Sequence, residues 1–223
     1  MKLTHWLIAG LLASSPLHAK QDAVESATQN IEIRYSTLFS KLKQNTKEGH
    51  EDVKIALFLL DQRDGSVCKI HRGSMRKDAH FEELVIPDNN EMSVPLDNNL
   101  RQANPDVTFV IDDGITCDVS MQVIAKQAFD NAIQQQDVAN LIPQMNQMMS
   151  DLGGMFSSWF MPDVAGVVVH FDEPMNNPVK FANGQLAESN GNSVILPLAS
   201  LADGETVSFS QPIVKVTPWI PQA

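Results

Sequence analysis

Two cysteines and a nearby histidine are the residues whose types and spacing first indicate chemistry. Cys68 and His71 stand three positions apart, which suits two ligands of one metal ion, and Cys117 is a candidate third ligand. The competing interpretation is a disulfide between Cys68 and Cys117, which would close a loop of 49 positions (117 minus 68). Closing a loop of that size stabilises a fold by roughly 4 kcal/mol. Because no second Cys or His cluster accompanies the pair and Cys-x-x-Cys is absent, the sequence favours the disulfide.

Methionines gather in the middle of the chain and offer thioether ligands to a soft ion. Cu(I) is the ion that such a cluster would bind. The same residues recur at helical spacing, so packing in a core explains them without copper. We therefore predict neither a metal nor any other cofactor at the methionines, which are Met145, Met148, Met149, Met155 and Met161.

Histidine and serine residues do not fall into any catalytic motif. Gly-x-Ser-x-Gly, His-Glu-x-x-His and glycine-rich phosphate loops are absent. A lone histidine in an apolar segment, as at position 170, is typical of ordinary packing. We assign no catalytic residue, although Ser, His and Asp residues distant in sequence can converge in space. No two of four histidines have the three-to-five spacing of ligands on one helix face; these are His50, His71, His80 and His170.

Two acidic segments are candidate calcium loops. They are Asp61-Gln62-Arg63-Asp64-Gly65 and Asp112-Asp113-Gly114. Both lie where a hairpin is predicted to turn, and turns favour Asp and Gly for backbone reasons. The spaced oxygen ligands of a calcium-binding loop are missing, so the sequence favours turns, with calcium as the alternative.

The N-terminus has the pattern of an export signal. A basic start at Met1-Lys2 precedes an apolar run, Trp6–Ala13, that is too short to span a bilayer, and the helix-breaking segment Ser14–Ala19 follows. We predict cleavage near Ala19 and a periplasmic location. No later apolar stretch is long enough for a transmembrane helix, so the mature protein is expected to be soluble.

The charge of the chain argues against one class of partner. Its 223 residues contain 16 Lys and Arg against 27 Asp and Glu, which gives a net charge of -11. A chain this acidic lacks the basic stripe that binds phosphate backbones. We therefore expect no nucleic acid partner and no anionic membrane surface.

Two stretches of the chain resemble each other. Residues 52–73 and 163–184 lie 111 positions apart (163 minus 52) and align without a gap. Each begins with an apolar strand pattern, such as Val53–Leu60, and continues through a turn into a second strand that runs back beside the first. The identical pairs are Asp52 and Asp163, Val53 and Val164, Asp61 and Asp172, Lys69 and Lys180, and Gly73 and Gly184.

The correspondence continues toward the C-terminus of each stretch. Cys68 aligns with Val179 and Cys117 with Val214. Replacement of a pair of cysteines by a pair of valines is expected where the two positions contact each other in a core. The alignment therefore supports the disulfide over the metal site. We predict an internal duplication, with chance similarity of two β-rich units as the alternative. Later matching segments are Ser93–Leu96 with Ile195–Leu198, Val107–Val110 with Val207–Ser210, and Ile115–Val119 with Pro212–Val216.

These patterns predict an α+β fold that is mostly β. We expect two tandem antiparallel β modules, each a sandwich or a small barrel and each preceded by a helix. The predicted divisions are a signal peptide at 1–19, a helix and β module with the disulfide at 20–125, a helical connector at 126–162, and a second β module at 163–223.

An apolar stripe follows the predicted connector at alternating spacings of four and three. Pro143 and Gly153-Gly154 should kink or interrupt its helix. The stripe either packs on the two β modules or forms a surface that binds a partner, a role to which Met side chains are suited. We call this set the connector stripe: Val138, Ile142, Met145, Met149, Leu152, Phe156 and Trp159.

Four segments also carry a resemblance to a known family. They are Tyr35–Lys43, Val53–Leu60, Val94–Leu100 and Cys117–Val123. Together they resemble an uncharacterised periplasmic family of Gram-negative bacteria, known as a domain of unknown function. The resemblance extends over nearly the whole mature chain. None of its segments is a functional motif, so it implies no catalytic residue.

Two functional interpretations follow. The first is an exported, soluble, non-enzymatic envelope protein that binds another envelope protein, a second copy of itself or another ligand. The second is a hydrolase or a metal-dependent periplasmic enzyme whose site is assembled from residues distant in sequence. Because motifs are absent and acidic groups lie mostly in turns, the sequence favours the first.

Overall fold

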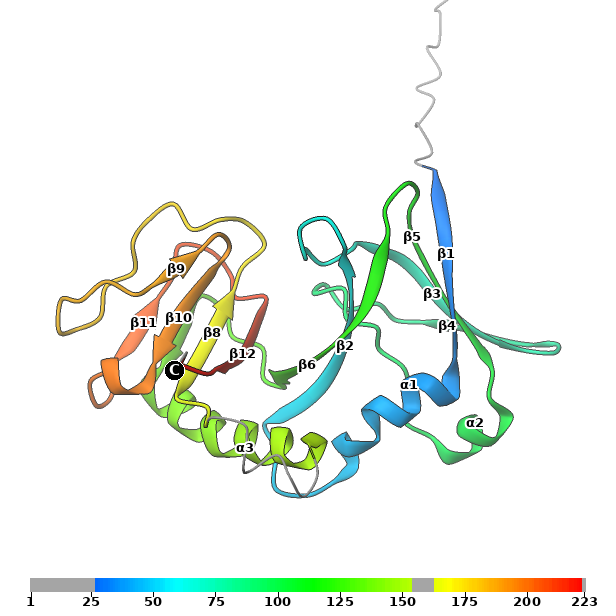
Figure 1. Cartoon of the computed structure of the whole chain (residues 1–223), viewed down its shortest axis with the longest axis horizontal. Coiled ribbons are helices and arrows are strands. Elements are labelled where there is room, and N and C mark those ends of the chain that lie inside the picture. Colours follow the sequence, from blue (N-terminus) through cyan, green and yellow to red (C-terminus); the bar gives the residue numbers. More distant parts are fainter. Residues whose placement is uncertain (1–26, 154–162, 222–223) are drawn as a thin grey trace, which may run out of the picture.

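The structure is a computed structural model of the chain and describes residues 27–153 and 163–221. It shows two β-rich halves side by side, with helices along one side of both (Figure 1). The predicted signal peptide, residues 1–19, lies outside the described residues. So do Phe156 and Trp159 of the connector stripe.

The first half contains two antiparallel sheets. One has the strand order β1-β5-β3-β4, and the other pairs β2 with β6. The strand β2 is rich in apolar residues and is buried on both faces, as expected for a central strand. The elements are β1 (Thr28–Arg34), α1 (Tyr35–Leu42), η1 (Lys43–Thr46), β2 (Val53–Asp61), β3 (Ile70–Lys77), β4 (His80–Leu84), α2 (Asn98–Ala103), β5 (Asp106–Asp112) and β6 (Cys117–Ala125).

The second half also contains two antiparallel sheets. Their strand orders are β12-β8-β10-β9 and β11-β7. In β8, Gly166 lies so close to β10 that an added Cβ would be 2.3 Å from the carbonyl oxygen of Leu196, so only glycine fits there. The elements are β7 (Ala132–Gln134), α3 (Gln135–Gly153), β8 (Gly166–His170), β9 (Ser189–Asn190), β10 (Ser193–Pro197), η3 (Leu198–Ser200), β11 (Thr206–Ser208) and β12 (Lys215–Trp219).

The predicted fold class is confirmed: the chain is α+β, mostly β, with antiparallel sheets. Among the described residues the sheets do not close into a barrel.

The partner of β2 differs from the prediction. The segment after its turn does not run back beside it as a strand. It contacts the end of β2 through an isolated bridge between Leu60 and Val67 and through backbone hydrogen bonds from Asp61 N to Ser66 O and from Cys68 N to Leu59 O (both 2.8 Å). Instead, β3 pairs with β4 and β5, and β2 pairs with β6 over nine residues. Turn residues show where a chain reverses, but they do not determine which strand pairs with the next edge of a sheet.

The two halves share an order of pairings. β1 enters α1 and pairs with β5, placing Ile33 opposite Val107. β7 enters α3 and pairs with β11, placing Ile133 opposite Val207. Each helix leads to an apolar strand, β2 or β8. A duplication would produce this order, and the duplication itself stays a prediction.

The helix α3 packs against both halves. Its beginning corrects the predicted connector, because residues 132–134 form β7 and the helix starts at Gln135. Asp137 in its first turn accepts a hydrogen bond from Gln134 N (3.0 Å), a contact that favours helix initiation. The helix contacts β2, β6 and β8, and Pro143 lies within it.

The described part of the connector stripe faces the core. Val138 and Met145 are completely buried in an apolar cluster that contains residues of both halves. Ile142, Met149 and Leu152 are half-buried and pack against the same cluster. This burial favours internal packing for these residues, and a partner surface on the stripe as a whole stays a prediction.

Candidate functional site

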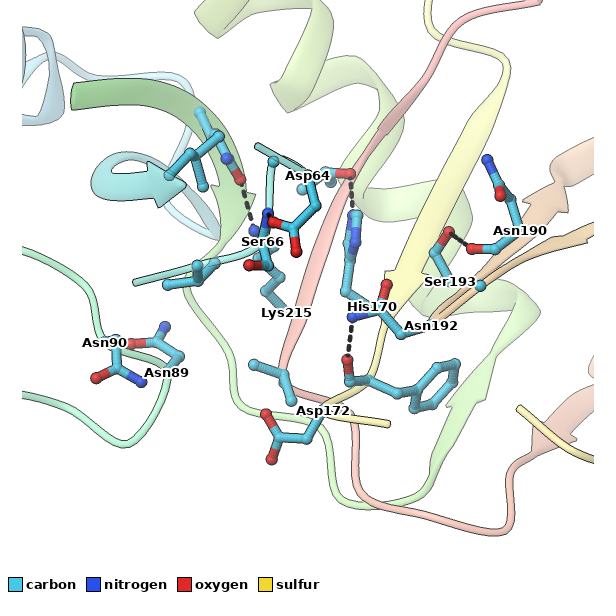
Figure 2. Close-up of a pocket in the computed structure, with 18 of the residues that line it drawn as sticks. Asp64, Ser66, Asn89, Asn90, His170, Asp172, Asn190, Asn192, Ser193 and Lys215 are labelled. Carbon is cyan, nitrogen blue, oxygen red and sulfur yellow. Dashed lines mark hydrogen bonds between the residues drawn. The ribbon is translucent and has the colours of Figure 1, made fainter. Parts of the chain in front are cut away.

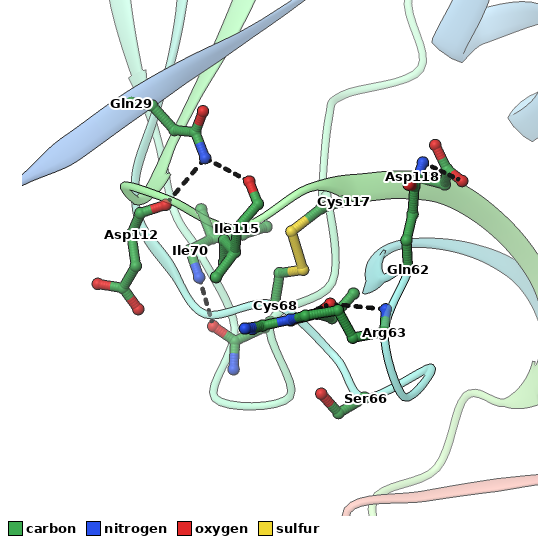
Figure 3. Close-up of a disulfide and its surroundings, with 12 residues drawn as sticks. Gln29, Gln62, Arg63, Ser66, Cys68, Ile70, Asp112, Ile115, Cys117 and Asp118 are labelled. Atoms are coloured by element: carbon green, nitrogen blue, oxygen red, sulfur yellow. Dashed lines mark hydrogen bonds and ion pairs between the residues drawn. A yellow bond between two sulfur atoms is a disulfide. The ribbon is translucent and has the colours of Figure 1, made fainter.

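Cys68 and Cys117 are bonded to each other, with their Cα atoms 6.6 Å apart. Figure 3 shows the bond between the segment that follows β2 and the beginning of β6. The predicted disulfide is therefore confirmed. Since it takes up both sulfur atoms, Cys68 and His71 are not a metal half-site. His71 Nε2 lies 2.7 Å from Asp112 Oδ1 instead.

The acidic segment after β2 is a turn. Asp61 accepts hydrogen bonds from the side chain and the backbone N–H of Arg63, and these bonds lower the pKa of Asp61 to about 2. Asp64 Oδ1 accepts from Ser66 N (2.9 Å), and Gly65 has a φ of +73°, which glycine adopts most easily. These contacts support the turn interpretation. Among the described residues, no cluster of three or more His, Cys, Asp or Glu side chains could hold a metal ion.

The structure describes three of the methionines that were candidate Cu(I) ligands, and all three pack in the core. Met145 and Met148 are completely buried, and Met149 is half-buried against the same core. Met155 and Met161 lie outside the described ranges. Packing therefore accounts for the three methionines that the structure describes.

A polar cleft of about 850 Å³ lies between the two halves. Figure 2 shows side chains from both halves converging on it. The turn after β2 and the segment before Met92 supply residues of the first half. The second half supplies the end of β8 and the β9–β10 hairpin, while β6 and β12 meet beside the cleft. Its polar and charged lining includes Asp64, Ser66, Asn89, Asn90, Gln122, His170, Asp172, Asn190, Asn192, Ser193, Lys215 and Thr217.

Lys215 on β12 joins the two halves at this cleft. Its Nζ donates to Gln122 Oε1 (2.8 Å) on β6 and lies 4.5 Å from the ring centroid of Phe58 on β2. The buried Phe58 ring offers its face to the ammonium group. Burial lowers the pKa of Lys215 to about 8. Within the described part of the chain, no carboxylate forms an ion pair with it.

His170 on β8 is the neighbour of Lys215. The two residues are opposite each other in the β8–β12 register, and His170 Nε2 lies 2.9 Å from Thr217 Oγ1. Burial, and then the positive charge of Lys215, lower the pKa of His170 to about 4. The imidazole is therefore neutral near pH 7.

Backbone groups hold several amide and hydroxyl side chains of the cleft. Asn89 Oδ1 accepts from Glu91 N (3.1 Å), and Asn192 Nδ2 donates to Phe171 O (2.9 Å). Ser193 Oγ donates to the carbonyl oxygen of residue 190 (2.9 Å). Asn89 and Asn192 thus each use one polar side-chain atom within the fold. Asn89 Nδ2 and Asn192 Oδ1 have no hydrogen-bond partner in the described part of the chain and are left as a donor and an acceptor for a ligand.

His170 and the Asp64 turn stand out in the sequence, whereas Lys215 does not stand out as a site residue. Lys215 begins a short strand whose other residues are mostly apolar or β-branched. A lysine in such a strand is a weak signal, because either face of the strand could have been exposed to solvent. Nothing in the sequence indicates that Gln122 and Phe58 belong to the site, since their contact with Lys215 depends on how the two halves pack.

The sequence segments that suggested a known family also meet in the structure. Tyr35 Oη donates to Pro95 O (2.6 Å) and accepts from Asp97 N (3.0 Å). A family model described as a protein of unknown function, DUF2987, matches residues 27–171. The chain belongs to the DUF2987 family. This confirms the predicted resemblance to a domain of unknown function.

The DUF2987 match extends from the strand β1 through β8 and includes Asp64, Gln122 and His170 of the cleft. Lys215 and Asn192 lie beyond it. Neither the curated proteins nor the solved structures include a match to this DUF2987 chain. In the described ranges of the chain, no helix is both long and apolar enough to cross a membrane.

Proposed function

We propose that this DUF2987 protein is an exported, non-enzymatic binding protein that holds a ligand in the cleft between its two halves. The observation that carries the proposal is Lys215, a partly buried ammonium group that lines the cleft without a carboxylate partner among the described residues. Polar groups that converge in a concave site are typical of ligand binding. The amides of Asn89 and Asn192 add directed donors and acceptors from opposite halves.

The titration of His170 supports binding over catalysis. A general base works best when its pKa is near the working pH. The pKa of His170 is lowered to about 4, so near pH 7 the imidazole is a weak base. Lys215, with a pKa of about 8, is mostly charged at pH 7 and attracts an anion more readily than it attacks a carbon atom.

Export is the second part of the proposal. The predicted signal peptide at 1–19 supports it. The disulfide between Cys68 and Cys117 also supports it, since such bonds persist in oxidising compartments such as the periplasm. A partner protein or a second copy on the connector stripe is a less favoured form of binding, because Val138 and Met145 are buried.

A hydrolase or metal-dependent enzyme is the second candidate function. One observation favours a hydrolase: His170 Nε2 and Thr217 Oγ1 are 2.9 Å apart, the separation of a base and the hydroxyl nucleophile that it activates. The two residues lie 47 positions apart, so the site would be assembled from distant residues. Loss of ester or amide hydrolysis in Thr217→Val, with hydrolysis retained in Ser40→Ala on α1, would establish this candidate.

Hydrogen exchange of the full-length mature protein tests the binding proposal. Compounds that raise its melting temperature in a screen of periplasmic small molecules should slow amide exchange at residues 64–67 and 190–193, on opposite sides of the cleft. Ser66→Trp, which places a large ring in the cleft, should abolish the protection. Ser40→Trp on the exposed side of α1 is the matched control. Stabilising compounds that protect neither segment would refute binding in the cleft.

A further inference from the structure

We propose that the ligand of the cleft is a monocarboxylate whose carboxylate group binds Lys215 Nζ, with the polar body of the ligand between Asn89 and Asn192. The inference rests on the proposed function and deepens it, because it names the chemical class of the ligand. Its basis is the arrangement of the one cation that lines the cleft in the described part of the chain.

The ammonium group of Lys215 has unused hydrogen-bonding capacity. It carries three N–H donors. Gln122 Oε1, a neutral acceptor, takes one of them at 2.8 Å, and the Phe58 ring lies against another side of the group at 4.5 Å. The ring attracts the charge but is no substitute for an anionic acceptor. A partly buried charge without a counter-ion is unfavourable. An anion bound to Nζ would supply the missing counter-ion.

The charges around Lys215 favour an anion with a single negative charge. Asp64 and Asp172 line the same cleft from opposite halves, and no Arg or second Lys lines it in the described residues. A phosphate dianion would bring two negative charges to a cleft that already holds two carboxylates and one ammonium. Phosphate sites generally use Arg forks or several donors. A carboxylate needs only one cation and places the least additional charge near the aspartates.

The amide groups determine what the rest of the ligand must offer. Asn89 Nδ2 is a donor from the first half and Asn192 Oδ1 is an acceptor from the second. A ligand between them needs both an acceptor and a donor, as hydroxyl and amide groups provide. The volume of about 850 Å³ lies within the range of small-molecule sites, roughly 300–1,000 Å³. A short peptide or oligosaccharide belongs to this size class.

Two kinds of molecule supply this chemistry: a short peptide with a free C-terminus and an acidic oligosaccharide. Equilibrium dialysis with mass spectrometry distinguishes them with four probes. The first two are a pool of randomised tripeptides with free C-termini and the same pool with amidated C-termini. The others are a trisaccharide with a single terminal glucuronic acid, which carries one carboxylate, and the methyl ester of the same trisaccharide. Each is tested on the full-length mature protein with its disulfide intact.

We expect at least one acid probe to bind, and its amide or ester to bind at least tenfold more weakly. Lys215→Met should weaken that acid probe at least tenfold and leave binding of the amide or ester unchanged. The matched control is Lys77→Met, the same substitution at an exposed lysine of β3, which should bind as the wild type does. If Lys215→Met does not fold, Lys215→Gln removes the charge while retaining a donor for Gln122.

Binding of the amidated or esterified probes as tightly as the acids would overturn the monocarboxylate inference and leave the proposed function standing. Equal binding by wild type and the Lys215 variants would overturn it as well. If none of the four probes binds, the inference is wrong, and the exchange experiment then decides the proposed function separately.

Discussion

His170 and Lys215 are opposite each other on β8 and β12, and the charge of Lys215 contributes to the low pKa of the imidazole. Both residues line the cleft. The pair therefore places one charged and one neutral nitrogen group at the boundary between the two halves.

The His170 pKa is predicted to rise when the charge of Lys215 is removed. In Lys215→Met we expect an increase from about 4 toward the ordinary value of 6.5. The increase should be partial, because burial is the larger cause of the shift. Titration of the imidazole by NMR measures it. Lys77→Met is the control, and an unchanged His170 pKa in Lys215→Met would contradict the electrostatic contact.

His170 should make the folded state lose stability as pH falls. Its pKa is lower when folded (about 4) than its ordinary value of 6.5, so between these values the unfolded chain binds the proton more readily. The contribution of His170 is complete above about pH 6.5 and is lost as pH falls toward 4. Urea unfolding at pH 7 and pH 4.5 should show a smaller loss in His170→Gln than in the wild type. A loss of equal size in both proteins would count against the buried neutral histidine.

Lys215→Met should stabilise the protein at pH 7. The substitution keeps most of the aliphatic side chain on Phe58 and removes a charge whose burial is unfavourable, as its lowered pKa indicates. Replacement of a buried ion pair by apolar side chains often stabilises a protein by about 1–4 kcal/mol, and Lys215 has no carboxylate partner to lose among the described residues. Urea unfolding measures the change, with Lys77→Met expected to have little effect. A less stable Lys215→Met would show that the ammonium group is favourably solvated.

Reduction of the disulfide should destabilise the fold by roughly 2–4 kcal/mol. Urea unfolding with and without a reductant gives the difference. The double variant Cys68→Ala with Cys117→Ala should resemble the reduced protein and should no longer respond to reductant. A response of that variant would mean that the reductant acts elsewhere.

Tyr35→Phe should cost about 1–3 kcal/mol of stability, since it leaves Pro95 O and Asp97 N without their buried partner. Ser40→Ala is the control, because it removes an exposed hydrogen bond of the hydroxyl on the same helix. Urea unfolding compares the two. Similar small effects would show that water replaces the tyrosine hydroxyl.

The sequence predicted the features that local patterns and residue chemistry determine. The strand Val53–Asp61 follows from a long apolar run, and the disulfide follows from an isolated pair of cysteines, Cys68 and Cys117. The fold class follows from short strand patterns separated by turns. Burial of the described connector stripe follows from its spacing, although spacing alone did not decide between a core and a partner surface.

The sequence could not predict features that depend on the packing of distant segments. β6 rather than β3 pairs with β2, and nothing in the turn after Asp61 encodes that choice. The short strand β7 is recognisable only through its partner β11. The cleft is the clearest case. Lys215 meets Gln122 and Phe58 from the other half, and this contact exists only once the two halves are placed together.

The helix α3 determines how the cleft can respond to a ligand. Because it packs on β2, β6 and β8, strands on both sides of the cleft are attached to the same helix. Hinge closure around a ligand would require that helix to bend or its packing to break. The protein should therefore lose little conformational entropy when a ligand enters the cleft. Selectivity should depend on the length of the ligand, because the separation of the two halves is fixed.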